Sequence, residues 1–392
     1  MAVVGGGPGG LVLARVLQLH GVPVTVFERD PASGARAQGG TLDLRPDSGQ
    51  AAVSAAGLDA EFRELSRPEG EEMRLLDASG RTLLRHTPGP GLPERPEIDR
   101  ADLRRMLLGS LEAGTVRHGV LVHGVEDAGG GRGSRVLFAR ESGGGAGELT
   151  GGQPQGPYRS EEFDLVVGAD GGRSRVRAQL GGVAPVFSGV HFVESRIEKA
   201  AARAPEAART VGDGSVYAFE GGRGIMAQLN TSGTVRIYFV LRQPEHALPW
   251  PDGAGPAGIR DALRRHFSGW SPALLALLDG CEDVFHDRPL HTHGAGRTWP
   301  AHPRATLVGD AAHLMTPFAG MGANLALLDG AELGLAVAES ATVPEALERY
   351  ERAAVPRGAR AIARSARGLA ACMSSEAPGS AVAYFTSPGE DG

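Results

Sequence analysis

The chain has 392 residues, 41% of them hydrophobic, which is enough for two lobes around a sizeable core. Its formal net charge of −6 and the lack of a long basic run argue against nucleic acid or an anionic membrane as partner. Two cysteines (Cys281 and Cys372) without metal-ligand spacing, no signal peptide and no apolar run of about 18 residues together favour a cytoplasmic protein without a metal site or a membrane span.

The chain starts with the pattern of a βαβ unit. A short apolar strand over residues 2–4 leads into a glycine turn, and residues 11–20 predict a buried helix that ends at Gly21. The next strand covers residues 22–28. Strand, glycine turn, helix and strand in this order are typical of a parallel sheet.

Later segments predict a mixture of helices and strands. The glycine-rich stretch 129–156 is expected to form a loose hairpin tip, and the tail after Met373 is expected to fray. The other predicted elements are a helical turn at 61–65, a hairpin of 73–77 with 82–85, a helix at 99–113, a strand at 163–168, antiparallel strands at 191–197, 215–220, 225–229 and 234–241, helices at 259–267 and 272–278, a strand at 305–308, and helices at 323–340 and 343–369.

The first motif is the turn formed by Gly5, Gly7, Pro8, Gly9 and Gly10. Glycines in this pattern permit a tight turn, close approach of the backbone to a pyrophosphate, and close packing of helix on sheet. Glu28, at the end of the second strand, stands near the ~20-residue offset at which a carboxylate binds a ribose hydroxyl. We interpret the unit as a dinucleotide site; the alternative is a structural turn followed by an exposed glutamate.

The second and third motifs come later in the chain. Asp170 lies in an Asp-Gly turn rich in arginine, which suits anion contacts, although Asp170 alone could simply cap the following turn. The last predicted strand ends in Gly309-Asp310 and leads through a glycine-bearing loop into a helix. A carboxylate there suits a ribityl chain, and backbone N–H groups suit a ring that must carry negative charge, as a reduced flavin does.

Together, the segments GGGPGG, ERD at 28–30, GADGGRSRVR and GDAAHLMTPFAGMGANLAL resemble the flavoprotein aromatic hydroxylases, which are single-component FAD monooxygenases. The resemblance covers the chain to about residue 369, and the ordered set of three motifs is highly specific. Residues 35–44 and 96–104 are similar to the Tet(X)-type branch, which inactivates tetracycline and so confers antibiotic resistance.

The resemblance implies an α/β fold. A Rossmann-like FAD-binding domain of the GR2/PHBH type would carry an inserted antiparallel-sheet substrate domain and a long C-terminal helix. The predicted division is an FAD-binding domain of residues 1–70, 96–180 and 282–342, a substrate-binding domain of 71–95 and 181–281, a C-terminal helix of 343–372 and a tail of 373–392. We expect a monomer.

The resemblance also implies residue roles. Glu28 would bind the adenosine ribose of FAD, Asp310 the ribityl and pyrophosphate region, and Arg36 the nicotinamide cofactor, with NADH and NADPH both open. Arg100 and Asp43 would contact FAD, although the one could be a surface charge and the other a turn former. The implied cofactor-binding set further contains the first glycine turn with Pro8, and Arg29, Asp170, Pro317, Gly320, Gly322 and Asn324.

The substrate is implied less sharply than the cofactor. Glu194 stands where the Tet(X) branch has a substrate-binding glutamine, and the arginine expected near residues 212–216 is missing. These departures weaken the case for tetracycline itself and leave a polycyclic or phenolic molecule. In the implied mechanism NAD(P)H reduces FAD, O₂ adds at the flavin C4a, and the distal oxygen of this hydroperoxide passes to the substrate.

No catalytic side chain is needed for this mechanism, and we assign no role to the lone histidines. A flavin halogenase is disfavoured because Lys199 is the only lysine and no Trp-x-Trp motif occurs. A flavin dehydrogenase or reductase of the same fold stays open, as does a flavin-binding sensor without turnover.

Overall fold

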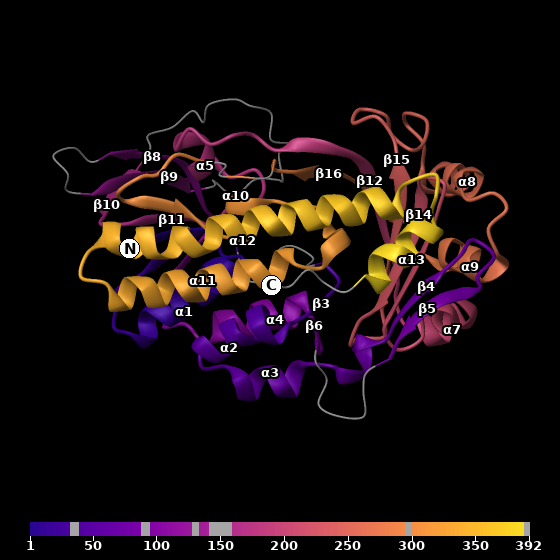
Figure 1. The fold of residues 1–392 in the computed structure, drawn as a ribbon, viewed down its shortest axis with the longest axis horizontal. Helices are drawn as coiled ribbons and strands as arrows, with labels where there is room; N and C mark the ends of the chain where they lie inside the picture. The colour runs from indigo at the N-terminus through magenta and orange to yellow at the C-terminus, as the bar shows by residue number, and fades with distance from the viewer. Residues whose placement is uncertain are drawn as a thin grey trace.

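The computed structural model describes residues 1–31, 39–87, 95–127, 133–140, 159–294, 296 and 299–387. The described chain forms a small parallel sheet and a large mixed sheet, and helix α12 (Val343–Cys372) runs along the long axis of the molecule from one to the other (Figure 1). The α/β fold with a long C-terminal helix is thus as predicted. No helix in the described part of the chain is both long and apolar enough to cross a membrane.

The small sheet is parallel, in the order β17-β11-β1-β2-β7. Its strands are β1 (Ala2–Val4), β2 (Thr25–Glu28), β7 (Val116–His118), β11 (Val166–Gly168) and β17 (Ala305–Leu307). Because β11 pairs with both β1 and β17, the carboxyl ends of these three strands lie next to one another. Each of these ends leads into one of the three predicted motifs.

Helices cover one face of the parallel sheet and a three-stranded sheet covers the other. Helices α1 (Pro8–Leu19) and α11 (Gly322–Glu339) pack with α12 against the first face. A Cβ on Gly330 of α11 would lie 2.2 Å from the Gly9 oxygen, and a Cβ on Gly334 would lie 2.8 Å from the Val16 side chain. These contacts advance together along both helices, so α1 and α11 run parallel and start at the same edge of the sheet. The other face packs against β8 (Val120–Asp127), β9 (Ser134–Arg140) and β10 (Arg159–Phe163).

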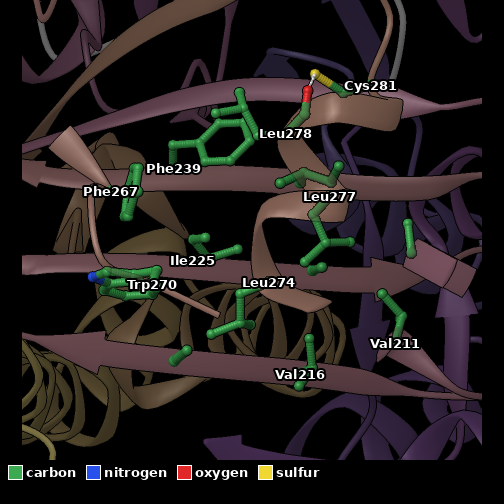
Figure 2. Packing of buried hydrophobic residues seen from close by; sticks show 14 of the residues in the cluster. Val211, Val216, Ile225, Phe239, Phe267, Trp270, Leu274, Leu277, Leu278 and Cys281 are labelled. Carbon is green, nitrogen blue, oxygen red and sulfur yellow. Dashed lines mark hydrogen bonds between the residues drawn. The ribbon is translucent and has the colours of Figure 1, made fainter. Parts of the chain in front are cut away.

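The large sheet has the order β16-β12-β15-β14-β13-β4-β5. Its strands are β4 (Met73–Leu76), β5 (Thr82–His86), β12 (Val186–Ile197), β13 (Ser215–Glu220), β14 (Arg223–Leu229), β15 (Val235–Arg242) and β16 (His286–Thr292). Its outer face carries α6 (Ala200–Arg203), α7 (Pro205–Val211), α8 (Pro256–His266) and α9 (Pro272–Gly280). Figure 2 shows Leu274 and Leu277 of α9 and the nearby Trp270 lying against Ile225 and Val216 of the sheet. This buried core determines which side chains of each strand lie under the helices and which lie on the opposite, inner face of the sheet.

Shorter elements connect the two sheets. A two-stranded ribbon of β3 (Thr41–Asp43) and β6 (Glu97–Asp99) lies between them and leads into α4 (Arg100–Gly109). The remaining elements are η1 (Pro46–Gln50), α2 (Ala51–Ala55), α3 (Asp59–Leu65), η2 (Pro68–Glu71), α5 (Arg175–Gln179), α10 (Asp310–His313), η3 (Pro317–Ala319) and α13 (Gly379–Thr386). The ribbon was not predicted from the sequence.

Three expectations are wrong in part. Stretch 129–156 contains strand β9, because Val136 and Phe138 are apolar and buried between sheets; the glycine-rich parts 128–132 and 141–158 lie outside the described residues. The four strands predicted to be antiparallel do pair in that way, and the large sheet is mixed only because β4 pairs with β13 in parallel. The tail forms α13 instead of fraying there, because Ala381 is fully buried in the interior. Strand β16 lies in the range predicted for the FAD-binding domain but pairs with β12; the domain division itself stays a prediction.

Candidate functional site

The first turn has a shape that only glycine permits. Gly5 has φ +109°, and a Cβ there would lie 2.3 Å from the oxygen of Ala169. A Cβ on Gly10 would lie 2.3 Å from the Gly5 oxygen. Gly7 differs, because the nearest atom to a Cβ there would be the Ala169 oxygen at 4.0 Å. Gly7 caps α1 and Pro8 is its first residue, so the backbone at the positive end of this helix is open to a ligand.

Glu28, at the end of β2, is bound to this turn. Its Oε2 accepts the N–H of Gly6 at 2.9 Å and its Oε1 accepts the N–H of Asp30 at 2.9 Å. Arg104 is buried and places Nη2 at 3.8 Å from Oε2, and this nitrogen has no hydrogen-bond partner among the described residues. A buried guanidinium nitrogen beside a carboxylate can donate to a sugar hydroxyl or a phosphate. The side chain of Arg29 is exposed at the same strand end.

The backbone of Asp170 lies against the first turn, and its carboxylate binds the start of α5. A Cβ on Gly5 would lie 2.9 Å from the Asp170 nitrogen. The Asp170 carboxylate accepts the Ser174 hydroxyl at 2.5 Å and the Arg175 N–H at 2.7 Å. Burial raises the pKa of Asp170, and these hydrogen bonds oppose the rise. The side chain therefore caps the start of α5, while a cofactor contact of Asp170 stays a prediction.

The third turn meets the first at the start of α11. A Cβ on Gly309 would lie 2.9 Å from the Ala326 Cβ, and a Cβ on Gly9 would lie 2.5 Å from the oxygen of the same residue. A Cβ on Gly322 would lie 3.9 Å from Oδ1 of Asp310. The structure therefore brings all three predicted turns together at one edge of the parallel sheet, beside the positive ends of two helices.

Asp310 and Arg100 are accessible charges near this edge. Desolvation by the surrounding protein raises the pKa of Asp310, and the charges of His313 and Arg100 oppose the rise. Arg100 begins α4, and a Cβ on Gly39 would lie 3.2 Å from its Nε. An accessible carboxylate and an accessible guanidinium are thus close enough to interact. Arg36 lies outside the described residues.

Asn324 joins the ribbon to the loop that precedes α11. Its Oδ1 accepts the N–H groups of Arg45 at 2.9 Å and Gly49 at 3.2 Å. Its Nδ2 donates to the Asp43 oxygen at 2.8 Å and the Gly320 oxygen at 3.3 Å. Both lone pairs and both protons of the amide are therefore used within the protein. Asn324 shapes the site, and its predicted contact with the cofactor stays a prediction.

The loop fixed by Asn324 contains η3, which starts at Pro317, and it ends at Gly320 in the left-handed region with φ +63°. A Cβ on Gly320 would lie 3.7 Å from Oδ1 of Asp43. Burial raises the pKa of Asp43, and Arg45 opposes this. The structure thus brings together Pro317, Gly320 and Asp43, which were predicted from separate parts of the sequence.

A charge network centred on the buried Asp329 supports the third turn. Oδ2 of Asp329 accepts the Gly309 N–H at 3.0 Å and lies 2.6 Å from Nε2 of His313. Oδ1 of Asp329 accepts Arg357 of α12 at 3.0 Å, and Arg357 also binds Glu332 at 2.6 Å. Desolvation would raise the pKa of Asp329, but the His313 and Arg357 partners outweigh it and lower this pKa. Asp329 therefore ties the turn that carries Asp310 to both α11 and α12.

A half-buried and a buried carboxyl group face each other in the ribbon. Asp43 pairs with Glu97 in the antiparallel register of β3 and β6, so their side chains share one face. Glu97 is 7% exposed, and its Oε2 has no hydrogen-bond partner among the described residues. Burial, and then the charge of Asp43, raise the pKa of Glu97 to about 8. Glu97 is therefore largely protonated at neutral pH.

The inner face of the large sheet meets the η3 loop through aromatic rings. Phe318 lies 6.0 Å from Phe192 and 6.1 Å from Phe219, measured between ring centroids. Phe192 in turn lies 5.2 Å from Tyr238. Glu194 pairs with Tyr238 across β12 and β15, so it lies on this inner face. The predicted substrate residue is thus on the side of the sheet that faces the three turns.

Helix α13 covers part of the same face. Phe385 stacks on Tyr217 at 6.2 Å, and the Tyr384 hydroxyl donates to the Phe318 oxygen at 3.3 Å. The helix therefore contacts both the sheet and the η3 loop, as its place beside β14 in Figure 1 also shows. Among the described residues, no cluster of acidic, histidine and cysteine side chains could bind a metal ion.

The sequence interpretation missed several residues that shape the site. Asp329 had a signal, since it is an acidic residue within a largely apolar helix pattern. No sequence pattern pointed to Arg104 or Glu97, because their importance depends on contacts between segments far apart in the chain. Phe318 lay within a predicted motif but was passed over in favour of the glycines around it.

Most of the chain matches flavoproteins in sequence. The family model described as "FAD binding domain" matches residues 1–365. The monooxygenase penA of Penicillium thymicola is 32% identical over 92% of this chain and 92% of its own length. The 3-amino-4-hydroxybenzoate 2-monooxygenase PtmB3 of Streptomyces platensis is 31% identical, with 91% of this chain and 84% of that protein covered.

Solved structures show the same fold. HpxO of Klebsiella pneumoniae, in complex with FAD and uric acid, superposes with a TM-score of 0.79 at 21% identity, over 98% of this chain and 91% of HpxO. The tetracycline destructase Tet(51) gives a TM-score of 0.68 at 19% identity, over 98% of this chain and 93% of that protein.

Proposed function

Since the chain belongs to the FAD-binding family of flavoprotein monooxygenases and is itself an FAD-dependent monooxygenase, we propose that it uses NAD(P)H and O₂ to hydroxylate an aromatic or polycyclic small molecule. The observation that supports this most is a single arrangement. Three glycine and aspartate turns meet at one sheet edge, and the η3 loop beside them packs against the aromatic face of a second sheet. Relatives named for aromatic substrates support the substrate class.

The residues present fit FAD. The backbone at Gly7 is open to a pyrophosphate, and the N-terminus of α1 adds its positive end. Glu28 and the spare nitrogen of Arg104 would bind the adenosine ribose. Asp310 would bind the ribityl chain, and the backbone of Pro317 to Gly322 would lie along the flavin ring. Bound FAD would supply the electron transfer and the oxygen activation.

The protein's own residues would position the substrate and exclude water. Phe192, Tyr238 and Phe318 pack on one another and form an apolar wall, and the partly exposed ring of Tyr238 is the part of it on which a substrate ring can lie. Phe385 of α13 extends this surface next to Tyr217. An apolar wall beside the flavin region limits water, which would otherwise compete with the substrate for reactive oxygen. The nicotinamide contact of Arg36, a monomeric state and a cytoplasmic location belong to the same proposal.

The tetracycline-inactivating branch and a role in antibiotic resistance remain predictions, because the likeness to tetracycline destructases concerns the fold. Glu194 and the missing arginine near residues 212–216 favour a different ring system. We therefore propose a polycyclic or phenolic substrate without committing the chain to tetracycline.

The test is turnover with labelled oxygen. The purified, FAD-loaded protein is given NADH or NADPH under ¹⁸O₂ with a panel of hydroxylated benzoates, naphthoates and quinolines, and products are analysed by mass spectrometry. A product that gains one ¹⁸O, with cofactor oxidation faster than in the substrate-free control, supports the proposal. Cofactor oxidation with product that lacks ¹⁸O would point to a dehydrogenase, and no oxidation with any compound would point to a sensor.

A further inference from the structure

Three charged residues form a group on the inner face of the large sheet. Glu194 of β12 is 5% exposed, and each of its oxygens accepts a hydrogen bond from a different arginine. Oε1 is bound by Nη1 of Arg236 on β15, and Oε2 is bound by Nε of Arg288 on β16. One carboxylate between two guanidinium groups leaves a net charge of plus one. Glu194 is thus already occupied as an acceptor, and the group as a whole attracts anions.

Strand register places this group beside the aromatic face. Arg288 pairs with Phe192 across β16 and β12, so both side chains point to the same side of the sheet. Phe192 is the residue whose ring lies 6.0 Å from that of Phe318 in the η3 loop. Arg288 therefore lies on the side from which a substrate would approach the flavin region.

The two arginines differ in accessibility. The Arg236 side chain is 15% exposed and that of Arg288 is 58% exposed. Arg236 is sufficient to neutralise the buried carboxylate, so the second arginine is not required for that purpose. Nε of Arg288 donates to Glu194, and this bond fixes the plane of the guanidinium. The fork formed by the two terminal nitrogens is directed away from this bond.

We infer that Arg288, oriented by Glu194, is a substrate-binding residue, and that the substrate is a planar aromatic compound bearing an ionised acid group. This inference rests on the proposed function and names its substrate class. The planar fork of an arginine matches a carboxylate in two parallel hydrogen bonds, and the partly exposed ring of Tyr238, packed on the buried Phe192, supplies an apolar face for the aromatic ring. Glu194 is a positioning residue in this arrangement, and the anion meets the arginine.

The competing interpretation is an ion network that only joins strands. Exposed ion pairs contribute little to stability, and buried ones offset their desolvation cost only when their charges are fully paired. Arg288 lies on the edge strand with more than half of its side chain accessible, which fits a ligand contact better than a strand clamp. Arg100 adds to the positive charge on this side: burial raises the pKa of the partly exposed Tyr238, and Arg100 is close enough to oppose that rise.

The experiment compares matched acid and amide ligands by calorimetry on the FAD-loaded protein, without NAD(P)H. The probes are 4-hydroxybenzoate with 4-hydroxybenzamide, and 3-hydroxy-2-naphthoate with 3-hydroxy-2-naphthamide. We expect at least one acid to bind about tenfold or more tightly than its amide, as charge-assisted hydrogen bonds predict. Equal binding of acid and amide in both pairs, tighter binding of the amides, or no binding of any probe would overturn the inference.

Variants assign the preference to one residue. Arg288→Gln should bring the ratio of acid to amide affinity close to one, and Arg288→Lys should restore part of it. Glu194→Gln should weaken acid binding while amide binding stays the same. Arg264→Gln, which alters an exposed arginine of α8 paired with Asp279, is the control and should keep the native ratio. An unchanged ratio in Arg288→Gln contradicts the inference.

This test is independent of turnover. A protein that prefers acids through Arg288 but incorporates no ¹⁸O would keep the inferred ligand class and lose the proposed monooxygenase reaction. A protein that hydroxylates aromatic compounds without any charge preference would keep the proposed reaction and lose the inferred ligand class.

Discussion

Gly5 and Ala169 come so close that a Cβ on Gly5 would lie 2.3 Å from the Ala169 oxygen, and this contact joins the first and second turns of the site. Gly7, two residues on, has no such neighbour, since the nearest atom to a Cβ there would be 4.0 Å away. Gly5 therefore allows the two turns to pack closely, whereas Gly7 leaves the backbone open to a ligand. One sequence motif contains both kinds of residue.

Gly7→Ala should fold normally and bind FAD poorly. The added methyl group meets no protein atom closely, so the free energy of unfolding should change by less than about 1 kcal/mol. The same methyl would stand where the backbone must approach the pyrophosphate, and FAD affinity should fall by tenfold or more. Urea unfolding and titration of the apoprotein with FAD by flavin fluorescence measure the two effects.

Two variants serve as controls for Gly7→Ala. Gly109→Ala adds a methyl group at the end of α4, where nothing lies within 4 Å, and it should change neither quantity. Gly5→Ala should fail to fold or lose several kcal/mol of stability, because it clashes with backbone and must adopt a positive φ. Native FAD affinity in Gly7→Ala would place the pyrophosphate elsewhere.

Asp329→Ala should weaken FAD binding from a position that FAD does not touch. The substitution removes the acceptor of the Gly309 N–H and leaves buried His313 without its carboxylate. Loss of one partner of a buried pair costs roughly 3–5 kcal/mol of stability. The turn that carries Asp310 should also become mobile, so FAD affinity should fall as well. Urea unfolding and FAD titration check both, with Glu348→Gln in the exposed pair with Arg352 as the control. Unchanged FAD affinity would show that the turn keeps its shape without Asp329.

Asn324→Asp tests whether the amide shapes the η3 loop. The variant keeps an acceptor for Arg45 and Gly49 but replaces the donor to the oxygens of Asp43 and Gly320 with a second acceptor. Each unpaired buried group costs about 1–3 kcal/mol, so stability and FAD affinity should both drop. Asn324→Ala should behave no worse than Asn324→Asp, since it removes the repulsion as well as the bonds. Thermal melting with and without FAD provides the measurement, and a variant that binds FAD like the native protein contradicts the role.

The glycine motifs could be found in the sequence because each rule is local. Gly5 and Gly10 fulfil a turn geometry that depends on residues a few positions away. The parallel order of β1, β11 and β17 then brought the predicted turns together, because strands of a parallel sheet share one carboxyl edge. This part of the site was predictable from short segments and one topological rule.

The substrate side was not predictable in the same way. Glu194 was singled out from the resemblance, but its two arginine partners come from other strands, and only the register of β12 with β15 and β16 reveals them. Helix α13 was missed because it has only eight residues and follows a stretch rich in Ser, Gly and Pro, and it is held by the contact of Phe385 with Tyr217. Contacts across long stretches of chain decide both features.

Glu97→Gln should change how stability depends on pH. Burial, then the charges of Asp43 and Asp99, raise the pKa of Glu97 from 4.5 to about 8, against the opposing charges of Arg67 and Arg100. Because the folded-state pKa is above that of the unfolded chain, folding favours the protonated acid, and the native protein should lose stability as pH rises from about 4.5 to about 8. Glutamine mimics the protonated acid, so the variant should match the native protein at pH ~5 and exceed it by roughly 2–4 kcal/mol at pH ~8.5. Titrating groups that do not interact with Glu97 are common to both proteins and cancel in the difference. Urea unfolding of both proteins across this range is the measurement, and a stability difference that does not vary with pH would mean that Glu97 ionises normally in the folded state.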